Sequence, residues 1–175
     1  ILVDNSEEEI QRYKYFCYSK MFDRSTLFLS IAPTMQCNFG CKYCFEGNNK
    51  KFPSMSEDIE KNLVAYLEHN KHRNLVLNWF GGEPLLAFDT IYSICKKLNE
   101  KGVPFSSSMV TNGSLLTPDV VGKLSPLHLT SIQISLDGTA IDHDRRRYYR
   151  NGSPSFYDID ANMEFLIKNT NIRLV

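Results

Sequence analysis

Three cysteines in one short segment are the residues best suited to chemistry in this chain of 175 residues. Cys37, Cys41 and Cys44 are separated by three and then two residues. Thiolates are soft ligands that suit iron–sulfur clusters or zinc. Three thiolates on one loop can bind three irons of a [4Fe–4S] cube and leave the fourth iron open to a small molecule. The spacing therefore predicts these three residues as metal ligands.

A structural zinc site is the alternative interpretation of the same cysteines. Such a site normally has four protein ligands. Other candidate ligands are Cys17, Cys95, His69 and His72. None of them has zinc-like spacing to the three clustered cysteines, and Cys95 lies among apolar positions where a cysteine packs as a small hydrophobe. An iron–sulfur cluster is therefore favoured over zinc.

Composition excludes several other classes of protein. Twenty basic and twenty acidic residues cancel to a net charge of +0, so no global field attracts nucleic acid or an anionic membrane. No apolar run approaches a membrane span, and the first residues lack the pattern of a signal peptide. Cysteines clustered in one loop, instead of spread in pairs, predict a reducing compartment and hence a cytoplasmic location.

Apolar strands alternate with amphipathic helices along the chain. Strands are expected at 26–32, 75–80, 105–110, 129–136 and 171–175, and helices at 57–71, 89–98, 117–124 and 156–168. Repeated strand–helix units of this length imply parallel strands with right-handed crossovers. Four units and the start of a fifth make about half of an eight-unit barrel. The predicted fold is thus α/β, a partial TIM-type barrel over residues 26–175 that is truncated, after an extension at 1–25.

The apolar spacing also predicts which faces are buried. The expected buried positions are Ile59, Leu63 and Leu67; Ile91, Ile94, Cys95 and Leu98; and Ile159, Met163, Leu166 and Ile167. Asp89 is the expected cap of the second helix. On the fourth strand, Ile132, Ile134 and Leu136 alternate with Ser131, Gln133, Ser135 and Asp137. The apolar set should meet the helices and the polar set the open interior.

Unusual residues follow each expected strand. Besides the cysteines after the first strand, these segments are Gly81-Gly82-Glu83-Pro84, Thr111-Asn112-Gly113 and Ser135-Leu136-Asp137-Gly138. In parallel α/β folds the chemistry takes place where the strands end. One rim of the barrel should therefore collect all four segments.

These motifs together resemble the radical S-adenosylmethionine (SAM) superfamily. Three segments carry the resemblance. Residues 33–46 include the three-cysteine loop with an aromatic before its third cysteine. The other two are Gly81-Gly82-Glu83-Pro84-Leu85-Leu86, and Ser135-Leu136-Asp137-Gly138 followed by His143-Asp144 and Arg147. The pattern is most similar to SPASM-type peptide- and protein-modifying maturases such as the anaerobic sulfatase maturases.

The resemblance implies a [4Fe–4S] cluster and SAM as cofactors. The reduced cluster would cleave SAM to methionine and a 5′-deoxyadenosyl radical that abstracts hydrogen. Gly81, Gly82 and Glu83 are then expected to accept hydrogen bonds from the SAM amine, with the glycines allowing close backbone approach. Ser135 would donate to the SAM carboxylate or ribose, unless it is a solvated residue at a strand end.

Other roles implied by the resemblance have alternatives. Arg147 matches the family arginine and could bind a carboxylate in bidentate fashion, or belong to a solvated run of charges. Tyr43 matches the aromatic near the adenine, with plain packing as the alternative. Asp137 and His143 are candidates for fixing the loop. Thr111-Asn112 could contact SAM, although the segment is also a good turn. No catalytic side chain is assigned.

Three functions compete at this point. The subgroup resemblance favours an enzyme that modifies a peptide or protein side chain, with flavodoxin or ferredoxin as electron donor. A glycyl-radical enzyme activase shares the cysteine triplet but usually lacks the Ser-Leu-Asp-Gly and His-Asp pattern. A structural zinc or iron–sulfur module would need no SAM pocket. The substrate itself is not specified by these residues.

Overall fold

A computed structural model describes residues 6–46 and 53–175 and contains a five-stranded parallel sheet. The strands are β1 (Thr26–Ile31), β2 (Asn74–Trp79), β3 (Phe105–Thr111), β4 (Leu129–Ile134) and β5 (Arg173–Leu174). Each strand pairs in parallel with the next strand along the chain. This order is that of a (β/α) barrel opened flat, which confirms the predicted fold class.

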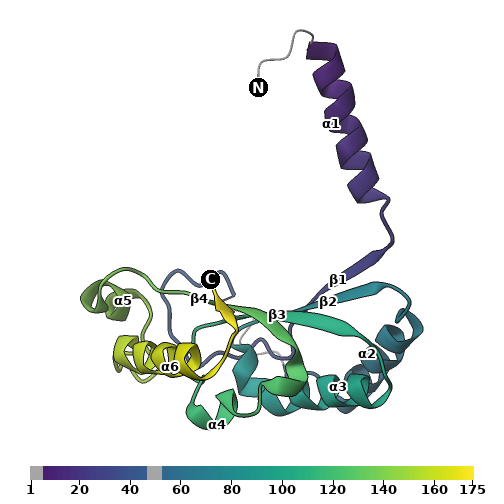
Figure 1. Ribbon diagram of the computed structural model, residues 1–175. Coiled ribbons are helices and arrows are strands. Elements are labelled where there is room, and N and C mark those ends of the chain that lie inside the picture. Colours follow the sequence, from purple (N-terminus) through teal and green to yellow (C-terminus); the bar gives the residue numbers. More distant parts are fainter. Residues whose placement is uncertain (1–5, 47–52) are drawn as a thin grey trace.

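Helices cover one face of this sheet (Figure 1). They are α2 (Glu57–His69), α3 (Phe88–Glu100), α4 (Pro118–Val121) and α6 (Phe156–Asn169), with short 3-10 turns at η2 (Pro84–Ala87) and η3 (Ser125–Leu127). The core between the layers includes Leu75, Leu77 and Trp79 of β2, all fully buried. The predicted buried stripe of α3, from Ile91 to Leu98, is confirmed and includes Cys95.

Two other helices confirm only part of the expected buried face: Leu67 of α2 and Ile159 and Leu166 of α6 are fully buried, as predicted. In α2 the side chain of Ile59 is 56% exposed, while Glu60, Val64 and Leu67 are buried. The Glu60 carboxylate can be buried there because it lies 2.6 Å from the ammonium of Lys97. In α6 the expected core residue Ile167 is 60% exposed.

Two boundary predictions were also wrong. Asp89 lies inside the first turn of α3, whose N-cap is Ala87 with no side-chain cap bond, because η2 leads directly into the helix. Strand β4 ends at Ile134, so the period-two alternation does not extend to Leu136, which is 40% exposed. Ser135 therefore lies on the loop after the strand.

The other face of the sheet carries polar side chains in register. Ser30, Asn78 and Ser108 lie side by side on three neighbouring strands. The amide of Asn78 donates to Ser30 Oγ at 3.3 Å, and the hydroxyl of Ser108 donates to Asn78 Oδ1 at 2.9 Å. The helix-facing side of the sheet is thus apolar, while the opposite side presents hydrogen-bonding groups.

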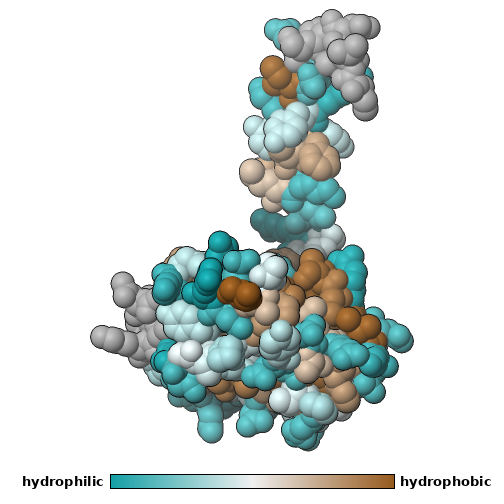
Figure 2. Space-filling model, turned by 90° about the vertical axis from the view of Figure 1, so that its left-hand side faces the viewer, coloured by the Kyte–Doolittle hydropathy of each residue, from teal (hydrophilic) through white to brown (hydrophobic). Residues whose placement is uncertain are grey.

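Helix α1 (Ser6–Met21) stands clear of this body (Figures 1 and 2). Its surface mixes apolar and polar side chains, and Tyr15 and Phe16 are among its exposed aromatics. None of the described helices is long and apolar enough to cross a membrane. The division between an extension at 1–25 and a core at 26–175 stays a prediction.

Candidate cofactor site at the cysteine loop

A cavity lies where the cysteine loop meets the ends of β2, β3 and β4. Its walls include all three clustered cysteines together with Tyr43, Gly81, Gly82, Ser135 and Arg147. The remaining lining residues are Phe39, Phe45, Glu46, Phe80, Val110, Thr111 and Asn112. Eight of the nine residues predicted for the site therefore face one cavity, and the exception is Glu83.

The two glycines after β2 receive the chain that leads into the cysteine loop. The backbone N–H of Gly82 donates to Thr34 O at 3.2 Å, and that of Glu83 donates to Gln36 O at 2.8 Å. A Cβ on Gly82 would lie 2.4 Å from the carbonyl oxygens of Met35 and Gln36, and Gly81 has a φ of +123°. Glycine is needed here because this backbone approaches too closely for any side chain.

Glu83 is fully buried behind the cavity wall. Its Oε1 accepts from Thr111 Oγ1 at 2.7 Å and from Leu85 N at 3.0 Å, while Oε2 accepts from Asn112 N at 2.8 Å. Burial raises the pKa of this carboxyl, and the three hydrogen bonds oppose that shift. The carboxylate thus joins the end of β2 to the end of β3, a placement different from the expected direct contact with SAM.

Asn112 lies beside the first cysteine. Its amide donates to Asn38 Oδ1 at 2.8 Å and lies 3.9 Å from the sulfur of Cys37. The backbone N–H of Phe39 also points to that sulfur, at 3.4 Å. Hydrogen bonds to ligand sulfurs are one means by which proteins set the potential of an iron–sulfur cluster. The Thr-Asn-Gly segment therefore contributes to the site as well as forming a turn.

A later segment of the chain is paired with the cysteine loop. The N–H of Gly40 donates to Tyr148 O at 2.8 Å, and that of Arg150 donates to Asn38 O at 3.0 Å. The intervening pair, Phe39 and Tyr149, forms an antiparallel bridge with rings in edge-to-face contact at 5.0 Å. All three residues between Cys37 and Cys41 are thus held by residues 148–150.

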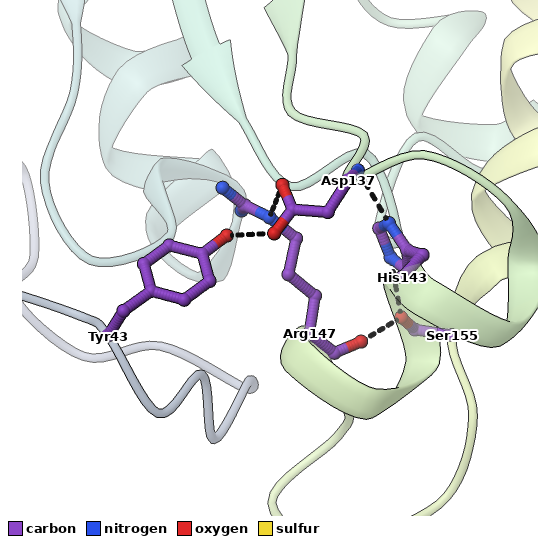
Figure 3. A network of polar contacts seen from close by, with 5 residues as sticks. All are labelled: Tyr43, Asp137, His143, Arg147 and Ser155. Carbon is purple, nitrogen blue, oxygen red and sulfur yellow. Dashed lines mark hydrogen bonds and ion pairs between the residues drawn. The ribbon is translucent and has the colours of Figure 1, made fainter.

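Side chains also connect the cysteine loop with the residues on either side of α5 (Figure 3). Tyr43 Oη donates to Asp137 Oδ2 at 2.5 Å, and Arg147 Nε donates to Asp137 Oδ1 at 3.0 Å. The Arg147 guanidinium also lies over the Tyr43 ring, 5.3 Å from its centroid. Burial and the hydrogen bond to Asp137 raise the pKa of Tyr43 to about 12, so the phenol stays protonated.

His143 lies behind this cluster, fully buried in α5 (Ala140–Arg146). Its Nδ1 is 3.3 Å from the backbone N of Asp137, and its Nε2 is 3.1 Å from Ser155 Oγ. Ser155 in turn donates to the carbonyl oxygen of Arg147 at 2.6 Å. His143 therefore supports the loop around Asp137, one of the roles expected for it.

Glu46 is a cavity residue that the sequence motifs did not single out. It is 8% exposed, and its Oε2 has no hydrogen-bond partner among the described residues. A buried carboxylate without a partner is costly, so this position fits a donor or a cation brought by a ligand. Its place two residues after the third cysteine is the signal that could have identified it.

The three clustered thiols line one cavity. Within residues 6–46 and 53–175, no three His, Cys, Asp or Glu side chains are grouped as they would be around one metal ion. In a [4Fe–4S] cube each cysteine sulfur binds a different iron, so the three sulfurs need to line one cavity but need not converge on one ion.

Sequence comparison identifies the family. The radical SAM superfamily matches residues 31–172, and the chain belongs to this superfamily. An uncharacterized protein of Methanocaldococcus jannaschii is 33% identical over 82% of this chain and 49% of its own length. The serine-type anaerobic sulfatase-maturating enzyme of Bacteroides thetaiotaomicron is 27% identical over 82% of this chain and 37% of its own. The chain spans half or less of the length of these relatives.

Comparison with solved structures agrees on the fold. Native anSMEcpe with bound AdoMet superposes with a TM-score of 0.72 at 23% sequence identity, covering 85% of this chain and 42% of the other. Superfamily membership gives the chain its cofactors, a [4Fe–4S] cluster and SAM, as the motifs predicted. The five-stranded sheet is thus part of a radical SAM core.

Proposed function

We propose that this chain is the radical-generating part of an enzyme that modifies a peptide or protein side chain. The observation that carries the proposal is one cavity at the strand ends whose walls include three thiols, two glycines and the arginine that follows α5. When bound, the reduced cluster supplies the electron that cleaves SAM to methionine and a 5′-deoxyadenosyl radical, which abstracts a hydrogen atom from the substrate. Cys37, Cys41 and Cys44 hold the cluster.

The cavity walls provide separate places for the parts of SAM. The carbonyl groups of Gly81 and Gly82, two residues that line the cavity, accept from the amine. Ser135 donates to the carboxylate or the ribose. Tyr43 and Phe45 offer apolar ring surface for the adenine, and Glu46 accepts from a donor group of the bound molecule.

Arg147 has its terminal nitrogens available for a carboxylate. Its Nε is bonded to Asp137, while no hydrogen bond of its Nη atoms is found among the described residues. Its side chain is 18% exposed and forms part of the cavity wall. A planar guanidinium fixed at one edge is pre-organised for bidentate binding at the other, so we assign Arg147 to the SAM carboxylate.

The peptide substrate is proposed from the relatives. The similar sequences include the radical SAM cyclopropyl synthase TigE, 28% identical over 82% of this chain, besides the sulfatase-maturating enzymes. A second solved structure, anSMEcpe with AdoMet and the Cp18Cys peptide, matches with a TM-score of 0.69. These relatives do not favour the activase alternative. A low-potential flavodoxin or ferredoxin as electron donor, and a cytoplasmic location, stay predictions.

The test is anaerobic reconstitution of the full-length protein with iron and sulfide. We expect a [4Fe–4S] spectrum, an electron paramagnetic resonance signal that changes on adding SAM, and formation of 5′-deoxyadenosine after reduction. Substituting Ala for Cys37, Cys41 or Cys44 should abolish the cluster. The matched control Cys95→Ala, in the buried stripe of α3, should keep it. One tightly bound zinc with no response to SAM would contradict the proposal.

A further inference from the structure

We propose that His143 is a positioning residue: as a neutral imidazole with its proton on Nε2, it fixes Asp137 and Arg147 in the arrangement that binds SAM. The inference rests on the proposed role of Arg147 toward the SAM carboxylate. It adds a residue outside the cavity to the function of the site. His143 is absent from the cavity wall and contacts it only through other residues.

The hydrogen bonds around the ring determine where its proton lies. Ser155 Oγ is 2.6 Å from the carbonyl oxygen of Arg147, which can only accept, so the hydroxyl donates there. The remaining contact of that hydroxyl, 3.1 Å from His143 Nε2, then requires a proton on Nε2. The N–H of Asp137 donates to Nδ1, which must be unprotonated. The first contact requires a proton on Nε2 and the second excludes one on Nδ1, so together they define the neutral Nε2–H tautomer.

The surroundings of the ring maintain this state. His143 is fully buried, and its ring packs edge-to-face on Phe156 at 5.6 Å. Burial lowers the pKa of the imidazole, with Arg147 acting in the same direction and Asp144 and Asp137 opposing it. A proton on Nδ1 would also face the N–H of Asp137. The neutral ring is therefore a fixed part of the fold, with one donor and one acceptor in defined directions.

The two bonds hold both ends of one short segment. Asp137 precedes α5 and Arg147 follows it, and the chain bends so that their side chains form an ion pair at 3.0 Å (Figure 3). His143 fixes the backbone of Asp137 directly and that of Arg147 through Ser155. His143 thus sets the geometry of the ion pair between Asp137 and Arg147 through their backbones, without touching either side chain.

This arrangement extends to the cysteine loop. Asp137 uses one carboxylate oxygen for Arg147 and the other for Tyr43, the residue before Cys44. A shift of the Asp137 backbone would therefore move both the guanidinium and the aromatic ring that line the cavity. We infer that loss of His143 weakens SAM binding more than it weakens cluster binding.

The experiment compares His143→Phe and His143→Gln in the reconstituted full-length protein. Phe keeps the buried ring and removes both polar atoms, whereas Gln restores a donor that can reach Ser155. We expect H143F to retain its iron and its [4Fe–4S] spectrum and to bind SAM about tenfold more weakly, the order found when a supporting hydrogen bond of a ligand residue is lost. H143Q should bind SAM with an affinity between those of H143F and the unsubstituted protein, because it restores the contact with Ser155 but not the acceptor for the Asp137 N–H. His69→Phe, an exposed position on α2, is the matched control and should change neither property.

A second measurement reads the proton directly. Nitrogen-15 NMR of the histidine-labelled protein, with His143 assigned through H143Q, should show a neutral Nε2–H ring between pH 6 and pH 8. An imidazolium or an Nδ1–H ring would overturn the proposal, and so would H143F with unchanged SAM affinity or with equal loss of cluster and SAM. If H143F does not fold, H143Q and the NMR result decide. Failure of the unsubstituted protein to respond to SAM would refute the proposed function separately.

Discussion

Glu83 provides the sharpest test of how the cavity is supported. Replacing it with Ala removes the acceptor for two buried backbone donors, Leu85 N–H and Asn112 N–H, and for the hydroxyl of Thr111. The hydroxyl can rotate, but the two backbone groups have no alternative. An unsatisfied buried donor costs about 1–3 kcal/mol, so E83A should lower the free energy of unfolding by about 2–6 kcal/mol.

Replacing Glu83 with Gln should have a much smaller effect. The amide oxygen can keep both bonds made by Oε1, while the contact of Oε2 with Asn112 N–H is lost. Removal of a buried charge opposes this loss, so E83Q should lie within about 1 kcal/mol of the unsubstituted protein. Urea unfolding monitored by circular dichroism measures both variants. Glu100→Gln, exposed at the end of α3, is the matched control.

E83A and E83Q also distinguish two roles for Glu83: joining β2 to β3 through hydrogen bonds, or contacting SAM directly. If Glu83 only joins β2 to β3, E83Q should bind SAM within about threefold of the unsubstituted protein by isothermal titration. If the carboxylate bonds the SAM amine directly, the lost charged hydrogen bond should weaken binding by about ten- to hundredfold. That weakening, or an E83A variant as stable as E83Q, would refute the bracing role derived from the three hydrogen bonds.

Three further predictions concern the same cavity. Gly82→Ala places a Cβ 2.4 Å from two backbone carbonyl oxygens, so the iron bound per chain should fall severalfold. The control is Gly122→Ala, whose Cβ would lie 3.4 Å from its nearest atom, and it should keep the full iron content. Glu46→Gln should retain the cluster and weaken SAM binding about tenfold in titrations; unchanged affinity would show that its unpaired oxygen serves no ligand. Because burial raises the pKa of Glu83, its contribution to stability is complete below the unfolded pKa of about 4.3 and is lost as pH rises through the folded value. The stability of the unsubstituted protein relative to E83Q should therefore decrease as the pH rises above the unfolded pKa in urea titrations, and an increase would contradict the shift.

The parts of the site that the sequence predicted are those with short-range patterns. The cysteine spacing and the Gly-Gly pair are local, and each follows an apolar run that predicts a strand, so one cavity could be expected from them. Helix faces were less certain where apolar residues are spread widely: Ile59 and Ile167 fit the spacing but lie on the solvent side. Their neighbours Val64 and Leu166 show that the direction of a helix face depends on packing across the layer.

Long-range pairing was outside the reach of sequence reasoning. Residues 38–40 and 148–150 form a single bridge, which leaves no alternation to recognise. Ser155 owes its role to burial and orientation, and neither property has a signature in the residue order, whereas Glu46 could have been identified only by its closeness to Cys44. The expected contact of Glu83 with SAM illustrates the same limit, since the position was predicted at the rim but the carboxylate turns toward β3.

The pairing of the cysteine loop with residues 148–150 also orders events during synthesis. The loop leaves the ribosome about 110 residues before its partner, a delay of about 5–20 seconds at ordinary elongation rates. During that interval Cys37 and Cys41 belong to a segment whose backbone partners do not yet exist. The backbone pairing of this loop is completed only after residues 148–150 have been made, so we expect cluster insertion to follow folding of the sheet.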